Sequence, residues 1–396
     1  MNKNYNYDVV IVGAGPAGSI CARYLAENNV KVMVVEKKQE IGTPKRCGEG
    51  IVTKSFDFDM DERWITSDID GLSLYSPGGK RLDVVSEVSK GHVIERKIFE
   101  KFLARDAINA GAKYMVKTRA IEVIKTDGKI SGIRAEFMGD EFNINSKLVI
   151  AADGVDSKIA KSAGLNTLNK LADYHSGFQY EMAGLKNYDL NMIHTYFGSE
   201  IAPNGYLWIF PKGEGIANVG IAILGERQTT GARAKDYLDK FIENHPEIFE
   251  GASPIEINAG GVPVSSSVEA FVDDNFMIIG DAAQQVNPIH GGGISIAMNS
   301  GKLAAEVAAE ALKEGDLSKE KLYKYEKIWR ETTGVKMQKL MRLRKAIEKL
   351  ADDDIEVLTD ALSGADITRL TDGKFKFLLK LLSKNPRTLL LLRKFI

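Results

Sequence analysis

Residues 7–18 read Tyr-Asp-Val-Val-Ile-Val-Gly-Ala-Gly-Pro-Ala-Gly. The β-branched run that ends at Val12 is typical of a buried parallel strand, and three glycines follow it closely. Gly13 permits a tight turn, Gly15 lets the backbone approach a pyrophosphate, and Gly18 lets a helix pack closely on the strand. The stretch therefore predicts the first half of a dinucleotide-binding unit.

The residues after this loop complete the unit. We expect a helix over 19–28 and a second buried strand over 30–35, which ends next to Glu36. Glu36 lies eighteen residues after Gly18 and is placed to accept hydrogen bonds from the hydroxyls of an adenosine ribose. The pyrophosphate would lie against free N–H groups at the positive end of the helix dipole. A bare glycine pattern also fits a flexible turn, but the complete order favours a dinucleotide, either FAD or NAD.

The composition is that of an ordinary globular protein of roughly two or three domains. Of its 396 residues, 44% are hydrophobic and 27% charged, and the net charge of -1 argues against a general role in binding nucleic acid. Cys21 and Cys47 cannot form a disulfide framework, and the cysteines and histidines show no metal-ligand spacing. Without a signal peptide or an apolar run long enough to span a bilayer, we expect a cytoplasmic protein, at most attached to a membrane surface.

Two later segments favour FAD over NAD. Residues 147–157 predict a buried strand that ends in the Asp153-Gly154 turn. Residues 276–283 predict another strand, after which Asp281 is suited to bind a ribityl hydroxyl, although an Asp in this place can also be a simple helix N-cap.

A glycine run then opens a helix. Residues 291–294 read Gly-Gly-Gly-Ile, and an alanine-rich helix is expected over 295–312. The first turn of such a helix offers N–H groups and a dipole to the anionic locus of a reduced flavin ring.

These motifs, in this order, resemble the glutathione-reductase-type flavoproteins with the para-hydroxybenzoate hydroxylase fold. Residues 45–50 (Lys-Arg-Cys-Gly-Glu-Gly) and 205–211 (Gly-Tyr-Leu-Trp-Ile-Phe-Pro) further resemble the geranylgeranyl reductase family, and in particular its archaeal branch, over nearly the whole chain. The resemblance implies FAD as cofactor and saturation of isoprenoid double bonds in membrane ether lipids. It also implies that FAD is contacted by Ala17, Glu36, Cys47, Gly48, Gly50, Arg96, Ala120, Asp281, Gly293 and Ile294.

The pattern changes between residues 166 and 269. Alternating segments predict antiparallel strands over 177–182, 192–197, 206–210 and 217–224. Tyr206 and Trp208 project from one face of a strand, Phe210 extends this aromatic row, and Tyr196 and Phe197 add to the same wall. Such a wall suits a long polyene chain, because burial is favoured by about 25 cal/mol per Å² of apolar area. An ordinary core stripe is the alternative.

The C-terminal third predicts helices. Residues 321–350 place Lys336, Lys339 and Arg342 on one basic face, and Lys336 is a candidate for binding the substrate. Residues 374–396 hold seven Lys or Arg and no acid among many apolar residues. Such a segment can lie on an anionic membrane or bind a phosphate head group, or it can be the solvated face of a packed helix.

The fold class is therefore α/β, and α+β overall, with three parts. We expect a Rossmann-like FAD domain with a parallel sheet, an antiparallel β substrate domain and a C-terminal helical segment. Their bounds are 1–74, 91–165 and 270–330 for the first, 75–90 and 166–269 for the second, and 331–396 for the third.

An isolated alkene has no carbonyl to attract a hydride, so the chemistry needs a proton donor. We hypothesise that protonation leads and that reduced FAD quenches the positive charge on the more substituted carbon. Cys47, whose neighbours Lys45 and Arg46 favour a thiolate, is a candidate donor, or else a small structural residue. His290 is a weaker candidate.

Three alternatives remain open from the sequence. A flavin monooxygenase could hydroxylate a hydrophobic substrate on the same fold, a related reductase could act on a chlorophyll-type side chain, and a lipid-carrying protein could keep a vestigial flavin site. We expect ferredoxin or NAD(P)H as the electron donor. The sequence shows no second glycine fingerprint for NAD(P)H, which favours ferredoxin.

Overall fold

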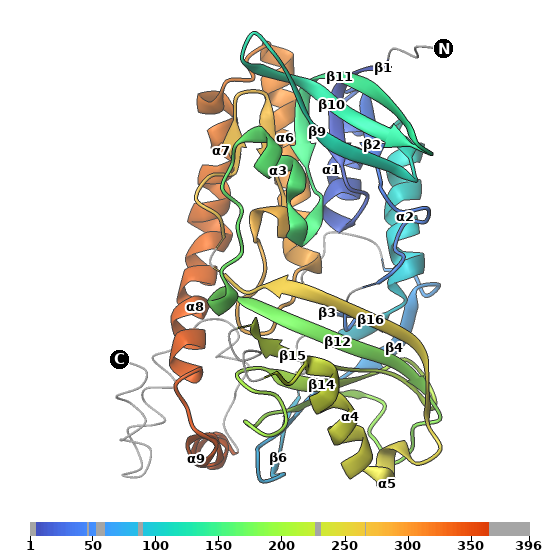
Figure 1. Ribbon diagram of the computed structural model, residues 1–396, viewed down its shortest axis with the longest axis vertical. Coiled ribbons are helices and arrows are strands. Elements are labelled where there is room, and N and C mark those ends of the chain that lie inside the picture. The colour runs from blue at the N-terminus through green and yellow to red at the C-terminus, as the bar shows by residue number, and fades with distance from the viewer. Residues whose placement is uncertain are drawn as a thin grey trace. The chain divides into compact units, whose positions relative to one another are not determined.

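The computed structural model describes residues 5–45, 47–52, 60–85, 90–225, 231–265 and 267–363 (Figure 1). The chain divides into two compact units, each assembled from three segments. Unit 1 comprises Met1–Lys45, Arg96–Asn169 and Pro263–Met337, and unit 2 comprises Arg46–Glu95, Lys170–Val262 and Gln338–Ile396. The chain therefore passes between the units five times.

Unit 1 is built on an eight-stranded sheet with a parallel centre. β1 (Tyr5–Val12) runs parallel to both of its neighbours, β2 (Val32–Val35) and β11 (Asp140–Ala151). Val9, Val10 and Ile11 are fully buried, as expected for a strand covered on both faces. The other strands are β8 (Lys113–Met115), β9 (Thr118–Thr126), β10 (Lys129–Phe137), β17 (Val272–Asp273) and β18 (Phe276–Ile278).

Helices pack on this sheet within unit 1. They are α1 (Pro16–Glu27), α2 (Arg96–Asn109), α3 (Lys158–Ala163), α6 (Ile294–Glu314) and α7 (Lys319–Trp329). α1 packs against both α2 and α6, and α7 packs against α6. Gly301 makes the approach of α6 to α1 possible, because a Cβ at this position would collide with the carbonyl of Ala17.

Unit 2 contains a seven-stranded sheet in the order β16-β12-β15-β14-β13-β5-β6. Its strands are β5 (Gly71–Tyr75), β6 (Arg81–Val85), β12 (Tyr174–Ala183), β13 (Met192–Tyr196), β14 (Tyr206–Pro211), β15 (Ile216–Leu224) and β16 (Ser253–Pro263). One face packs on α4 (Ala234–Asn244) and α5 (Pro246–Phe249) through a core that includes Leu207, Ile209, Val219 and Ile221. Alternate residues of the same strands face the opposite side.

Two smaller parts complete unit 2. A three-stranded sheet joins β3 (Gly50–Val52), β7 (Gly91–Ile94) and β4 (Ile65–Ile69). α8 (Val335–Ile347) follows α7 through a π-helical turn, and α9 (Asp352–Leu362) packs through Leu362 on Leu82 of β6. The carboxylate of Asp352 accepts the Ser199 N–H at 2.9 Å, and Glu356 accepts the Gly78 N–H at 2.5 Å.

The predicted fold class is confirmed: a parallel-centred sheet, an antiparallel sheet and C-terminal helices are all present. The basic segment 374–396 lies outside the described residues. Among the described helices, none combines the length and the apolar character that crossing a membrane requires. Within the same residues, no group of three His, Cys, Asp or Glu side chains could hold a metal ion.

Candidate functional site

The glycine loop after β1 has the geometry that its sequence predicts. Gly13 adopts φ 108°, and a Cβ on it would collide with the carbonyl of Ala152. A Cβ on Gly18 would collide with the carbonyl of Gly13, whereas one on Gly15 would meet nothing within 4 Å. α1 begins next to this open space, and no side chain caps it. Its first-turn N–H groups therefore suit the pyrophosphate of a dinucleotide.

Glu36 closes the loop from the end of β2. One carboxylate oxygen accepts the Ala14 N–H at 3.0 Å, and the other accepts the Lys38 N–H at 2.9 Å. A carboxylate has further acceptor sites for ribose hydroxyls. The main chain of Glu36 also accepts the Thr118 N–H at the start of β9, the strand that carries Ala120.

The Gly280-Asp281 turn and the start of α6 lie beside the start of α1. A Cβ on Gly280 would lie 2.9 Å from the Cβ of Ala17, and one on Gly293 would lie 3.2 Å from Oδ1 of Asp281. Gly293 is the N-cap of α6, no side chain caps this helix, and Ile294 is its first, buried residue. The structure thus brings together three motifs that are far apart in the sequence.

Several charged groups complete this region of unit 1. Burial raises the pKa of Asp281 above its ordinary value, and the guanidinium of Arg96 opposes this rise. Arg96 begins α2 and pairs with Glu100 at 2.5 Å. Asp153 accepts the Ile159 N–H through Oδ2, while its buried Oδ1 has no hydrogen-bond partner among the described residues. A buried oxygen of this kind suits a bound hydroxyl or water.

Lys336 and His290, the remaining candidates in this unit, lie on its surface. Both are exposed, Lys336 in the first turn of α8 and His290 in the loop before α6. The imidazole of His290 accepts the Gly292 N–H through Nδ1 at 3.1 Å, which orients the ring within its own loop.

Unit 2 holds the Cys47 loop. Cys47 is half-buried, its Sγ accepts the Glu49 N–H at 3.2 Å, and its carbonyl accepts Nε2 of Gln179 at 3.1 Å. The ring of Phe210 covers the two glycines of the loop: a Cβ would lie 2.9 Å from it at Gly48 and 2.8 Å at Gly50. Arg46, predicted to favour a thiolate, lies outside the described residues.

The predicted aromatic row is present on β14. Tyr206, Trp208 and Phe210 are half-buried on one face, with ring centroids 5.6 Å and 6.3 Å apart in turn. Trp208 donates its indole N–H to Oε1 of Gln179 at 2.9 Å, which links the row to the Cys47 loop.

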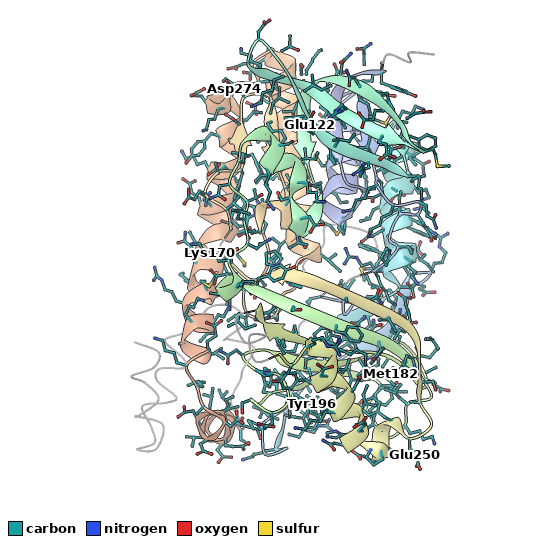
Figure 2. The ribbon with its side chains drawn as sticks, in the orientation of Figure 1. Glu122, Lys170, Met182, Tyr196, Glu250 and Asp274 are labelled. Carbon is teal, nitrogen blue, oxygen red and sulfur yellow. The ribbon has the colours of Figure 1, made fainter. Side chains whose placement is uncertain are left out.

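The prediction that Tyr196 extends this wall is wrong. Tyr196 pairs with Leu207 across β13 and β14, so it shares the opposite face with Leu207. It stacks on Tyr75 and packs against Phe241 in the core under α4. Figure 2 labels Tyr196 beside this helix. Phe197 is the next residue, and the centroid of its ring lies 6.1 Å from the ring centroid of Tyr206.

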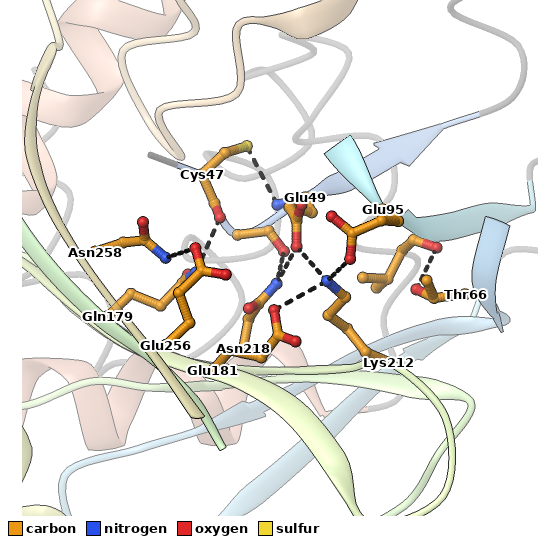
Figure 3. Close-up of polar contacts among 12 residues, drawn as sticks. Cys47, Glu49, Thr66, Glu95, Gln179, Glu181, Lys212, Asn218, Glu256 and Asn258 are labelled. Atoms are coloured by element: carbon orange, nitrogen blue, oxygen red, sulfur yellow. Dashed lines mark hydrogen bonds and ion pairs between the residues drawn. The ribbon is translucent and has the colours of Figure 1, made fainter. Parts of the chain in front are cut away.

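A buried ionic cluster beside the Cys47 loop was missed by the sequence reasoning (Figure 3). Lys212 Nζ lies 2.9 Å from Glu49, 2.8 Å from Glu95 and 3.1 Å from Glu181. Burial works against the charge of Lys212, but the carboxylates prevail and raise its pKa above its ordinary value. Two features of the sequence could have indicated this cluster. Lys212 directly follows the 205–211 motif, and polar residues alternate along β12.

Two family models match the chain. The model described as geranylgeranyl reductase catalytic domain matches residues 173–262, which contain most of the antiparallel sheet. The model described as pyridine nucleotide-disulphide oxidoreductase matches residues 7–181, which contain the glycine loop.

Curated relatives resemble the chain over almost its full length. The digeranylgeranylglycerophospholipid reductase of Methanocaldococcus jannaschii is 42% identical over 390 residues, which cover 97% of this chain and 96% of the relative. The protein of the same name from Methanosarcina acetivorans is 46% identical over 366 residues, which cover 90% and 88%.

Two solved structures superpose on the chain over most of its length. A geranylgeranyl bacteriochlorophyll reductase-like protein from Thermoplasma acidophilum is 37% identical and superposes with a TM-score of 0.91 over 99% of this chain and 100% of that one. The flavin-dependent brominase Bmp2, 21% identical with a TM-score of 0.73 over 93% and 94% of the two chains, shares the fold alone.

Proposed function

The chain belongs to the geranylgeranyl reductase family, and on this basis we propose that it saturates the isoprenoid double bonds of geranylgeranyl ether lipids for archaeal membrane phospholipids. The similarity to curated reductases along 90–97% of the chain carries the proposal. The protein is an oxidoreductase acting on CH–CH groups, with FAD as its cofactor.

The proposed FAD contacts in unit 1 follow from the chemistry of each group. The first turn of α1 holds the pyrophosphate, Glu36 binds the adenosine ribose, and Asp281 binds a ribityl hydroxyl. The N–H groups at the start of α6 would bind the anionic locus of the reduced ring. The remaining contacts proposed from the family resemblance are Ala17, Cys47, Gly48, Gly50, Arg96, Ala120, Gly293 and Ile294.

Reduced FAD supplies the hydride, so the protein must orient the alkene, exclude water and deliver a proton. We propose that Tyr206, Trp208 and Phe210 line the site for the polyene chain, since their apolar faces share one side of β14. Cys47, linked to this row through Gln179, holds the proton at Sγ for the less substituted carbon.

Mass spectrometry of the lipid tests this function. Protein reduced chemically under anaerobic conditions is incubated with geranylgeranyl ether phospholipid, and we expect mass gains in steps of two hydrogens. Gain of oxygen under air would instead indicate a monooxygenase, and unchanged lipid with flavin that stays reduced would indicate a carrier. A chlorophyll-type geranylgeranyl compound in parallel separates the two reductase specificities.

The electron donor is proposed to be a small reductant such as ferredoxin, with NAD(P)H as the other candidate. Anaerobic spectra of the bound flavin distinguish them. Rapid bleaching by reduced ferredoxin and none by NADH or NADPH supports the former, and the reverse result supports the latter.

A further inference from the structure

Glu49 has a backbone conformation that non-glycine residues rarely adopt. Its φ is 73°, in the left-handed region, and its side chain is fully buried. A buried acid in such a conformation persists only when its surroundings hold it. Glu49 lies between two glycines, Gly48 and Gly50. A third glycine would adopt this conformation without strain, so the side chain at this position needs an explanation of its own.

Two side chains hold the Glu49 carboxylate, one from Lys212 directly after β14 and one from Asn218 in β15. Nζ of Lys212 and Nδ2 of Asn218 lie 2.9 Å and 2.7 Å from the same oxygen, Oε2 (Figure 3). Asn218 also donates to the carbonyl of Gly48 at 3.2 Å and is fully buried. The main chain of Glu49 is held as well, because its carbonyl accepts the Ile94 N–H at 3.0 Å.

The held conformation directs the Glu49 N–H at the sulfur of Cys47. The N–H lies 3.2 Å from Sγ, and the carbonyl of Cys47 is fixed by Gln179 at 3.1 Å. A backbone N–H that donates to sulfur stabilises the thiolate, because the anion is the stronger acceptor, and this makes the thiol a stronger proton donor. The orientation of this N–H depends on the conformation of the turn, and therefore on the anchored carboxylate.

We propose that Glu49 is a positioning residue for Cys47, held in place by Lys212 and Asn218. The acid anchors the turn, and the turn presents its N–H to the sulfur. The inference rests on the proposed function only in treating Cys47 as the group that holds the proton.

Loss of the Glu49 charge and loss of its anchoring role have opposite effects on the formation of the Cys47 thiolate. This difference makes the inference testable. Replacing Glu49 by Ala removes a negative charge near the sulfur, and this alone would favour the thiolate. The same replacement releases the turn, and loss of the N–H would disfavour the thiolate. Substitution of Lys212 does not separate the two effects, because loss of its positive charge and loss of the anchor act in the same direction.

The experiment measures the rate of Cys47 alkylation by iodoacetamide against pH, by mass spectrometry of the FAD-loaded protein. Cys21 is fully buried, and a Cys47→Ala protein provides the blank. For Glu49→Ala we expect the midpoint of the curve of alkylation rate against pH to move up by about one pH unit. At a pH below the midpoint, alkylation of Cys47 should then be roughly tenfold slower. A midpoint that is unchanged or lower overturns the proposal, and so does a Cys47 that does not react in the unaltered protein.

Two further variants complete the test. Glu181→Ala removes another carboxylate from Lys212, but from β12 rather than from the turn, so we expect no upward movement. An equal rise in this variant would assign the effect to the cluster as a whole and overturn the proposal. Asn218→Leu releases the turn without a change of charge, and it should raise the midpoint even if Glu49→Ala does not fold. Alkylation needs no lipid, so its result can be interpreted even if the protein does not reduce the proposed substrate.

Discussion

Gly13 and Gly15 meet different surroundings, so alanine at each should have a different effect. At Gly13, with φ 108° and the Ala152 carbonyl in the way, a Cβ strains the backbone of unit 1. We expect Gly13→Ala to lose about 2 kcal/mol or more of unfolding free energy. Gly15→Ala meets open space and should change stability by less than about 0.5 kcal/mol, yet weaken FAD binding.

Flavin absorbance per chain after purification and urea unfolding of the FAD-free proteins separate these effects. Gly139→Ala is the control for φ alone, because Gly139 has φ 94° and open space around it. Equal loss of stability in the Gly13 and Gly15 variants would contradict the assignment.

The proposed proton donor gives a second prediction for a single residue. Cys47→Ala removes the donor and should lower the rate of lipid reduction by about 10²- to 10⁴-fold, the usual contribution of general acid catalysis. Cys21→Ala is the matched thiol control, since Cys21 is buried in α1. The rate is measured from the mass of the lipid product, and unchanged turnover would remove Cys47 from the mechanism.

Residue-level prediction from the sequence worked where partners are close in the chain. The roles of Gly13 and Gly18 in the turn follow from a strand, a loop and a helix within twenty residues. The Lys212 cluster could not be found this way, because Lys212 and Glu49 are 163 residues apart and neither belongs to a local pattern. Lys212 follows β14 directly and Glu49 precedes β3, so only the tertiary fold brings their side chains together.

Among the elements, the docking of α8 in unit 2 gives a prediction for pH. Burial, followed by the charges of Arg344 and Lys345, lowers the pKa of His175 from 6.5 to about 4. The unfolded chain therefore binds the proton more tightly. Stability is constant above about pH 6.5 and falls towards pH 4, by at most about 3 kcal/mol from this residue.

Urea unfolding at pH 7 and pH 4.5 measures this contribution. His175→Gln should reduce the difference between the two values, because glutamine does not titrate. His245→Gln is the control, since His245 is half-buried beside Phe241 in the same unit. The same pH difference in the unaltered and His175→Gln proteins would contradict the prediction.

The elements themselves were largely predictable, and their ends were less so. The helix after the glycine loop was expected from residue 19 but begins at Pro16, a favoured first helical residue that the loop pattern concealed. Four strands of the seven-stranded sheet, β12 to β15, were predicted within a few residues, whereas β5, β6 and β16 were not predicted. The pairing of β13 with β5 is parallel, and no local pattern indicates a neighbour more than a hundred residues away.

At the scale of the molecule, cofactor removal should destabilise unit 1 in particular. A ligand that binds only the folded state stabilises it by about 2.7 kcal/mol at a hundredfold excess over its dissociation constant. Most proposed FAD contacts lie in unit 1, so we expect the FAD-free protein to unfold at a lower temperature. Calorimetry with and without added FAD measures this, and identical transitions would contradict it.

The second prediction at this scale is that α8 binds an anionic membrane surface, which extends the proposed function. Lys336, Lys339 and Arg342 are exposed on α8, and each basic residue near an anionic bilayer contributes about 1 kcal/mol. Replacing all three by glutamine should weaken binding to anionic phospholipid vesicles roughly 100-fold, measured by sedimentation at low salt. Vesicles of neutral lipid are the control, and unchanged binding to anionic vesicles would exclude this face.

The alternation of the chain between two units has a consequence for synthesis on the ribosome. α1 leaves the ribosome early, yet α6, which packs against it, begins at Ile294. The part of α1 that packs on α6 therefore stays uncovered while some 270 further residues are made. Nascent chains arrested before α6 should remain sensitive to protease and retain no flavin, whereas chains released beyond it acquire both protection and colour.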